Sequence, residues 1–200
     1  MKLLSTLAVL AILTLVSFKI KDNTLQVKDY FAIPGPITYN KTPFNLSWSD
    51  HPNDTYYRQG YIPANEKEQT YTKMISVEAV IGAVNIKDIV KAKTNELDQR
   101  KQIDPLTNYQ VIVNKATGEY LLDFVVSQSI GDKKAVVEWN AYRYVTLKNI
   151  PGKKGILLFS YSKRGYGNGT TNFLKSLKTE RSTEINNFAA YKVPDVKLDR

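Results

Sequence analysis

The chain has 200 residues, of which 42% are hydrophobic and 11% aromatic, and it carries a formal net charge of +9. It contains no cysteine and one histidine, which excludes disulfide bonds, thiol catalysis and metal sites built from thiolates or from several histidines. We therefore expect a core held together by packing alone, with no metal and no cofactor.

The first 18 residues have the pattern of a secretory signal peptide. Met1 and Lys2 precede an uncharged apolar run, residues 3–18, which Lys19 ends. This run is shorter than the ~20 residues that a membrane-spanning helix needs. We therefore predict a signal peptide over 1–18, export to the periplasm or the cell exterior, and no transmembrane span in the mature, secreted protein. No A-x-A pattern precedes Lys19, so the cleavage position stays open and an uncleaved N-terminal anchor remains an alternative.

The next part of the chain has the pattern of strands. Residues 19–43 contain three prolines and a glycine among scattered apolar residues, which predicts an extended arm packed on the domain. The runs 44–49 and 55–62 are typical of strands, and the turn residues at 50–54 between them predict a hairpin. Residues 74–81 alternate between apolar and polar positions, as a half-buried strand does.

Two helices and four strands are expected after this point. Asn85 is expected to cap a helix that ends before Pro105, because apolar residues recur between them at helical spacing. Four strands follow at 108–113, 120–128, 135–147 and 155–163. The turns between these strands are short enough only for antiparallel hairpins, so the strands form a meander. A second amphipathic helix is expected over 171–188.

Together these elements predict an α+β domain at 44–192 with a C-terminal tail at 193–200. Its sheet is mainly antiparallel, contains the four-strand meander, and is covered by the two amphipathic helices. This order of elements resembles the Mog1/PsbP-like family of α/β sandwich domains over residues 44–190, and the segment 61–66 looks like part of exported bacterial proteins without assigned function. Members of the Mog1/PsbP-like family include accessory factors that bind a larger complex or a small GTPase. The resemblance therefore implies a non-catalytic binding role.

The strand register predicts a candidate ligand site. The shortest turns give three pairs: Val113 with Tyr120, Ile130 with Lys133, and Leu147 with Gly155. Trp139 and Phe124 then lie opposite each other in the core. The other face of the sheet collects the polar side chains and one tyrosine that form the candidate site: Gln110, Asp123, Glu138, Asn140, Tyr142 and Ser162. A sheet face open to water explains the same pattern.

The basic excess lies near the C-terminus, because residues 19–130 are balanced in charge and residues 131–200 are not. In an exported protein we expect the counter-charge to be an anionic envelope component or an unknown protein partner, and not nucleic acid. The candidate anion contacts come from the second meander turn and the end of the last meander strand: Lys133, Lys134, Lys163 and Arg164. The alternative is an ordinary soluble surface.

The sequence assigns no catalytic residue. The single histidine, His51, lies in a turn, whereas a catalytic triad is assembled from distant parts of a fold. A carboxylate pair could be drawn from Glu78, Asp123 and Glu138, but the sequence does not set their separations. We therefore favour a non-catalytic binding or accessory module of the cell envelope or exterior. The alternative is an exported hydrolase that uses the polar sheet face around Asp123, Glu138 and Asn140.

Overall fold

The structure is a computed structural model that describes residues 27–130, 134–148 and 150–198. The predicted signal peptide at 1–18 lies outside the described residues. The described chain forms eight strands, two α-helices and a short 3-10 helix: β1 (Ile37–Tyr39), β2 (Thr42–Asn53), β3 (Tyr56–Pro63), β4 (Lys73–Ile81), α1 (Ile86–Arg100), β5 (Asn108–Asn114), β6 (Glu119–Ile130), β7 (Lys134–Thr146), β8 (Gly155–Tyr166), η2 (Gly167–Gly169) and α2 (Thr170–Ala190).

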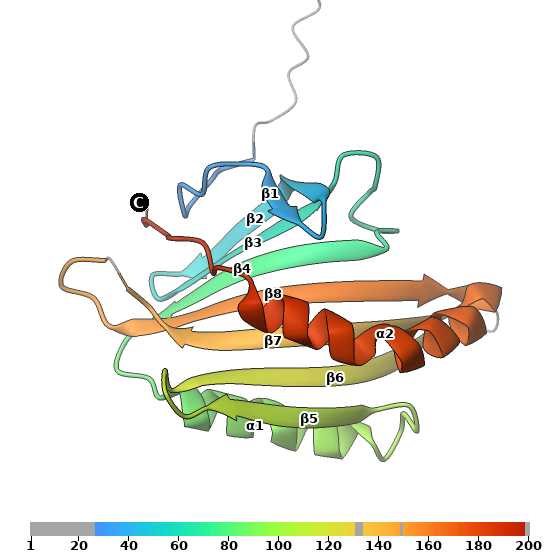
Figure 1. The fold of residues 1–200 in the computed structure, drawn as a ribbon. Coiled ribbons are helices and arrows are strands. Elements are labelled where there is room, and N and C mark those ends of the chain that lie inside the picture. The colour runs from blue at the N-terminus through green and yellow to red at the C-terminus, as the bar shows by residue number, and fades with distance from the viewer. Residues whose placement is uncertain (1–26, 131–133, 149, 199–200) are drawn as a thin grey trace, which may run out of the picture.

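These eight strands belong to one antiparallel sheet that curls into a half-barrel (Figure 1). The strand order is β1-β2-β3-β4-β8-β7-β6-β5, so the chain leaves β4, passes through α1 to the far edge at β5, and returns strand by strand to β4. The expected α+β fold with a mainly antiparallel sheet is confirmed. The four-strand meander is only half of that sheet, because β8 pairs directly with β4.

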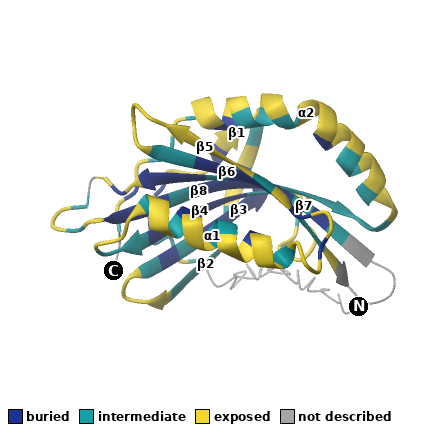
Figure 2. Ribbon diagram, turned by 90° about the horizontal axis from the view of Figure 1, so that it is seen from below, coloured by how far each residue is buried: buried dark blue, intermediate teal, exposed yellow. Residues whose placement is uncertain are grey.

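The two helices lie on opposite faces of the sheet, which we call the α1 face and the α2 face (Figure 2). α1 begins at the predicted cap, where the Asn85 side chain accepts the Lys87 amide N–H at 2.8 Å. The buried residues of α1 are Val90 and Leu97, and those of α2 are Leu177 and Phe188. Among the helices of the described chain, none is both long and apolar enough to cross a membrane.

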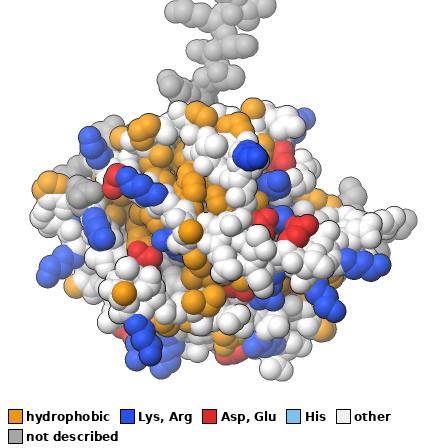
Figure 3. Space-filling view, in the orientation of Figure 1, with side chains coloured by type: hydrophobic (Ala, Val, Ile, Leu, Met, Phe, Trp, Pro, Cys, Tyr) orange, Lys and Arg blue, Asp and Glu red, His pale blue; other side chains and the backbone are white. Residues whose placement is uncertain are grey.

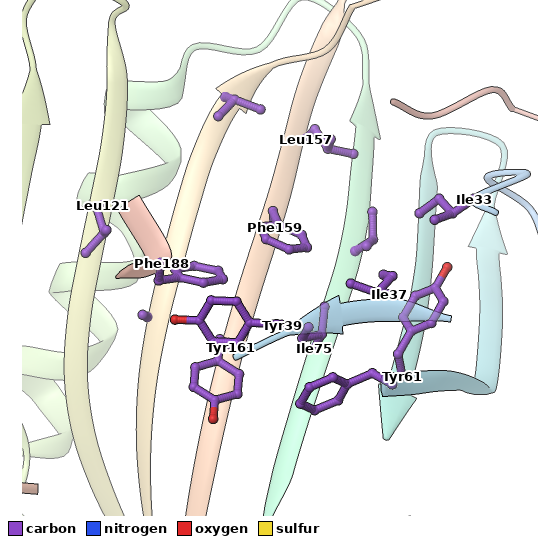
Figure 4. Packing of buried hydrophobic residues seen from close by; sticks show 14 of the residues in the cluster. Ile33, Ile37, Tyr39, Tyr61, Ile75, Leu121, Leu157, Phe159, Tyr161 and Phe188 are labelled. Atoms are coloured by element: carbon purple, nitrogen blue, oxygen red, sulfur yellow. The ribbon is translucent and has the colours of Figure 1, made fainter. Parts of the chain in front are cut away.

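The larger hydrophobic core lies on the α2 face (Figure 4). Tyr39 of β1 packs edge-on against Tyr161 of β8, with ring centroids 4.8 Å apart, and against Phe188 of α2, with centroids 5.7 Å apart. The segment before β1 contributes the completely buried Phe31 to the same core. The Lys197 amide donates to the Phe31 carbonyl at 2.8 Å, so the C-terminal segment lies against the N-terminal one.

A smaller core lies between α1 and the α1 face of the sheet. It consists of Val90 and Leu97 from the helix together with four strand residues: Leu122, Phe124, Tyr144 and Ile156. Since α1 packs mainly on β6, β7 and β5, the part of the α1 face formed by β3 and β4 extends beyond the helix.

The predicted register between β6 and β7 is wrong by one residue. The other two turn pairings hold, but Ile130 pairs with Lys134, one residue later than expected. A slip of one residue moves every side chain of a strand to the other face of the sheet. β5 and β6 are therefore inverted relative to β7 and β8: Trp139 pairs with Val125, and Phe124 lies on the opposite face.

The first hairpin is also longer than predicted. Asp50 lies within β2 and pairs with Arg58, and after an irregularity Asn53 pairs with Tyr56. The Asn53 side chain accepts the Thr55 amide N–H at 3.0 Å, the hydrogen bond of an Asx turn. The turn is consequently confined to the residues between Asn53 and Tyr56, and the expected turn residues before them are part of the strand.

Candidate functional site

The observed register divides the predicted ligand site between the two faces of the sheet. Asp123 and Gln110 pair with each other on the α2 face. The other four members lie on the α1 face: Glu138, Asn140, Tyr142 and Ser162. Asp123 therefore does not share a site with Glu138 or Asn140, and the prediction that all six residues lie on one face of the sheet is wrong.

Asp123 connects the sheet to α2. Its carboxylate is completely buried and accepts a hydrogen bond from Trp139 Nε1 at 2.6 Å and from Arg181 Nε at 2.8 Å. Both carboxylate oxygens are thus engaged by protein groups, while Gln110 beside it is exposed on β5. This arrangement holds the helix on the sheet.

Asn140 and Ser162 form a buried polar pair on the α1 face. Ser162 Oγ donates to Asn140 Oδ1 at 2.6 Å, and both residues are at most 2% exposed. Asn140 Nδ2 has no hydrogen-bond partner among the described residues, although a buried amide usually has one. Asn140 is therefore the least satisfied polar group of the predicted site.

Glu138 is neutralised by Arg164. Arg164 Nε donates to Glu138 Oε2, and the guanidinium lies 3.9 Å from the centroid of the Tyr71 ring. Tyr166 fixes this tyrosine by donating from its hydroxyl to the Tyr71 carbonyl at 2.6 Å. A predicted ligand residue, Glu138, and a predicted anion contact, Arg164, are thus paired with each other.

The predicted anion contacts are in part engaged as well. Lys163 Nζ lies 3.1 Å from Glu184 and 3.3 Å from Glu180, both on α2. Lys133 and the side chain of Lys134 lie outside the described residues. On the face that carries α2, the Lys and Arg side chains are spread around the margin and do not gather into one patch (Figure 3).

A groove of about 550 Å³ runs along α1 on the α1 face. The sheet side of the groove is formed by Tyr56, Glu78, Val80, Tyr142, Tyr144, Ile156 and Leu158. The helix side is formed by Ile89, Ala92, Lys93 and Glu96. Most of this lining is apolar or aromatic, which is the usual composition of a small-molecule site. Of the predicted ligand residues, only Tyr142 lines the groove.

Glu78 is the carboxylate on the sheet side of this groove. The Tyr56 hydroxyl donates to Glu78 Oε2. Burial raises the pKa of Glu78, and the Tyr56 hydrogen bond and the positive charges of Arg58 and Lys93 offset only part of that effect. The Glu78 carboxylate is therefore poorly compensated in its charged form.

Arg58 lies directly across from Glu78 in the β3–β4 register, but its guanidinium is directed to another acid. Its Nη2 and Nε donate to Asp50 Oδ2 at 2.7 and 3.1 Å. The ring centroids of Trp48 and Tyr56 lie 5.8 and 5.9 Å from the Arg58 Cζ. Among the described residues, no basic nitrogen forms a salt bridge with Glu78.

Aromatic rings surround the rest of the groove. Tyr142 and Tyr144 are neighbours along β7, with ring centroids 6.4 Å apart, and Phe124 packs edge-on against Tyr142 at 4.9 Å. Burial raises the pKa of both tyrosines, and the negative charge of Glu78 adds to the effect, so their hydroxyls stay neutral. The rings are therefore uncharged and lie near the Glu78 carboxylate.

The charges on the helix side cancel each other. Lys93 Nζ lies 2.8 Å from Glu96 Oε1 and 5.5 Å from the centroid of the Phe124 ring. Because this ion pair is internal to α1, Glu78 is the charged residue of the groove that forms no salt bridge within the described part of the chain.

A second hollow, of about 740 Å³, lies at the N-terminal end of α1. Its basic residues are Lys87, Lys153 and Lys154, and none of its polar side chains is buried. It has one aromatic ring, that of Tyr120, whereas the groove has three tyrosines, so the hollow has less of the aromatic lining that is typical of a small-molecule site.

The described chain is thus an α+β domain with an antiparallel half-barrel sheet and a groove beside one helix. A protein-family model matches residues 31–193, a span that runs from before β1 to beyond α2, and the chain belongs to that family. No curated protein and no solved structure matches the chain.

Proposed function

We propose that the protein is an exported, non-catalytic binding module that holds a small ligand in the groove between α1 and the sheet. The observation that carries this proposal is the composition of the groove, in which one poorly compensated carboxylate, Glu78, lies among tyrosine rings and aliphatic side chains. Concave, mainly apolar sites with few polar groups are typical of small-molecule binding.

The placement of the acidic residues supports binding over hydrolysis. The two carboxylates named for a hydrolase, Asp123 and Glu138, lie on opposite faces of the sheet and are each paired with an arginine. Glu78 has a tyrosine, not a second acid, as its hydrogen-bond partner. Hydrolysis of a glycoside requires two carboxyl groups that flank one bond.

Two features of the sequence support export and an accessory role. The uncharged run at 3–18 has the length and flanking charges of a signal peptide. The resemblance of the element order to Mog1/PsbP-like domains agrees with a binding role. Fusion of residues 1–30 to a reporter that is active only outside the cytoplasm tests the first point, and a reporter retained in the cytoplasm would contradict it.

Fluorescence of a neutral apolar dye, N-phenyl-1-naphthylamine, tests the groove as a binding site. We expect enhanced emission with the native protein and loss of that enhancement in Ala92→Trp, because the indole occupies the groove from the helix side. The matched control is Ile103→Trp, which places the same side chain at a residue 86% exposed and outside the groove. Equal dye binding by Ala92→Trp and Ile103→Trp, with both variants folded, would contradict the proposal.

A further inference from the structure

The charge state of the groove restricts the ligands that it accepts. Glu78 has no salt-bridge partner among the described residues, because the nearest arginine is engaged by Asp50 and the lysine of the groove is engaged by Glu96. A partly buried carboxylate without a salt bridge favours a ligand that brings a positive charge. An anionic ligand would be repelled at the same point.

The aromatic rings of the groove restrict the type of cation that the ligand can carry. Tyr56 contacts Glu78 directly, and Tyr142 and Tyr144 line the same groove. Aromatic faces attract organic cations through their quadrupoles, and quaternary ammonium groups are bound in this way by aromatic residues. A small hydrated metal ion would gain little from such walls.

The remaining lining of the groove is aliphatic and can contact an apolar part of the ligand. On the sheet side, Leu158 pairs with Glu78 and Ile156 pairs with Val80, and these apolar residues line the groove together with Ile89 and Ala92 of α1. Burial of a hydrocarbon group there would make the binding free energy more favourable by ~25 cal/mol for each Å² of apolar surface removed from water. The groove of about 550 Å³ has room for a body of this kind.

We propose that the ligand of the groove is an organic ammonium ion with an apolar body, its cationic group beside Glu78 and among the tyrosine rings, and its body along the aliphatic part of the groove. This inference rests on the proposed binding function of the same groove. It adds the chemical class of the ligand.

Competition with the bound dye, N-phenyl-1-naphthylamine, tests the ligand class. The probes are benzyltrimethylammonium and neopentylbenzene, which have nearly the same shape and differ in charge. We expect the ammonium ion to displace the dye at a concentration about tenfold or more below that of its neutral isostere, the ratio that a cation–π contact of moderate strength supplies.

The variant Glu78→Gln tests the named carboxylate, since Gln retains an oxygen that accepts the Tyr56 hydrogen bond. We expect this variant to lose the preference for the ammonium ion and to keep the affinity for neopentylbenzene. Glu68→Gln, which removes the same charge from an exposed residue outside the groove, is expected to keep the preference. Tyr144→Leu is expected to weaken ammonium binding about threefold to thirtyfold.

The possible results separate this inference from the proposed function. Equal displacement by both probes, or a preference that survives in Glu78→Gln, would overturn the inference and leave the groove as a binding site. Displacement by neither probe, with the dye still bound, would also overturn it. Failure of the dye to bind the native protein would contradict the proposed binding function itself.

Discussion

Two carboxylates of this domain, Asp104 and Glu78, are expected to have opposite effects on its stability at neutral pH. Asp104, which follows α1, is 6% exposed and accepts hydrogen bonds from Ser127 Oγ and Ser127 N at 2.6 Å, and from Thr107 Oγ1 at 2.9 Å. The Leu106 amide N–H at 3.1 Å and Arg100 Nε at 3.2 Å donate two more hydrogen bonds to it. One side chain therefore fastens the end of α1 to β6.

Replacement of Asp104 by Asn is expected to destabilise the fold at neutral pH. Burial acts to raise the pKa of Asp104, but the hydrogen bonds from Ser127, Thr107 and Arg100 outweigh it and lower the pKa. The carboxylate therefore contributes stability above its ordinary pKa of ~3.9, and this contribution is lost as the pH falls toward the lower pKa of the folded state. We expect Asp104→Asn to cost ~2–3 kcal/mol at pH 7 in urea unfolding, and Asp54→Asn, in an exposed turn, to cost less than ~0.5 kcal/mol. Equal effects of the two changes would contradict this role.

Glu78 has the opposite dependence on pH. Because burial raises its pKa in the folded state, the carboxyl group destabilises the fold once the pH exceeds the ordinary Glu value of ~4.3. The penalty grows until the pH passes the raised pKa of the folded protein and is constant above it. We expect Glu78→Gln to be more stable than the native protein at pH 7 and equal to it below pH ~4. Unfolding measured at both pH values checks this, and lower stability of the variant at pH 7 would contradict the burial of an uncompensated charge.

At the scale of elements, the β6–β7 register decides which side chains cooperate. Trp139 shares the α2 face with Asp123 and donates a hydrogen bond to it, whereas Phe124 packs under α1. Directly bonded residues show coupling energies of ~0.5–3 kcal/mol, and residues without shared contacts are additive within ~0.5 kcal/mol.

A pair of double-mutant cycles tests that register. Trp139→Phe with Asp123→Ala is expected to show coupling in the free energy of unfolding, because either change removes the same hydrogen bond. Trp139→Phe with Phe124→Leu is expected to be additive. The register predicted from the shortest turns requires the reverse result, so strong coupling of Trp139 with Phe124 would contradict the structure.

Gly60 allows β2 to lie close to β3. A Cβ atom at Gly60 would come within 2.1 Å of Trp48 Nε1, a ring that contacts the guanidinium of Arg58. We expect Gly60→Ala to displace Trp48 and to cost ~1–3 kcal/mol in thermal or urea unfolding, as overpacking does. Gly169→Ala, where no atom lies within 4 Å of the added Cβ, is the control. A negligible cost at Gly60 would show that Trp48 is free to move aside.

Much of the fold was predictable from the sequence because its elements have strong local signals. Apolar alternation marked the strands, and Asn85 marked the start of α1 with a cap that the structure contains. The β6–β7 register was not predictable, since a connection one residue longer than the shortest turn changes no local pattern but inverts two strands. The prediction that the candidate ligand residues share one face of the sheet was wrong for that reason.

The groove could not be predicted from the sequence, for a different reason. It exists because α1 crosses the sheet between strands that are distant in the chain, and hydrophobic periodicity does not report where a helix crosses. Tyr142 entered the predicted site through the polar pattern around it, and Glu78 was recognised only as one of several acids. A charged residue in the middle of the alternating run 74–81 was the available signal.

At the scale of the whole molecule, ion pairs attach α2 to the sheet and use part of the basic excess. Arg181 pairs with Asp123, and Lys163 pairs with Glu180 and Glu184. Two of the four predicted anion contacts, Lys163 and Arg164, therefore have acidic partners within the domain. Attraction to an anionic envelope component stays a prediction, and the spread of Lys and Arg side chains in Figure 3 favours a diffuse effect over a localised patch.

A crystal structure of the protein with benzyltrimethylammonium tests the central claim most directly. The account predicts electron density for the ammonium group next to Glu78, within ~6 Å of the tyrosine ring centroids, and for the phenyl ring beside Leu158 and Ile156. It also predicts that the same soak of Glu78→Gln crystals leaves this position without the ammonium ion. A cation bound elsewhere on the molecule, with the groove filled only by solvent, would contradict the account.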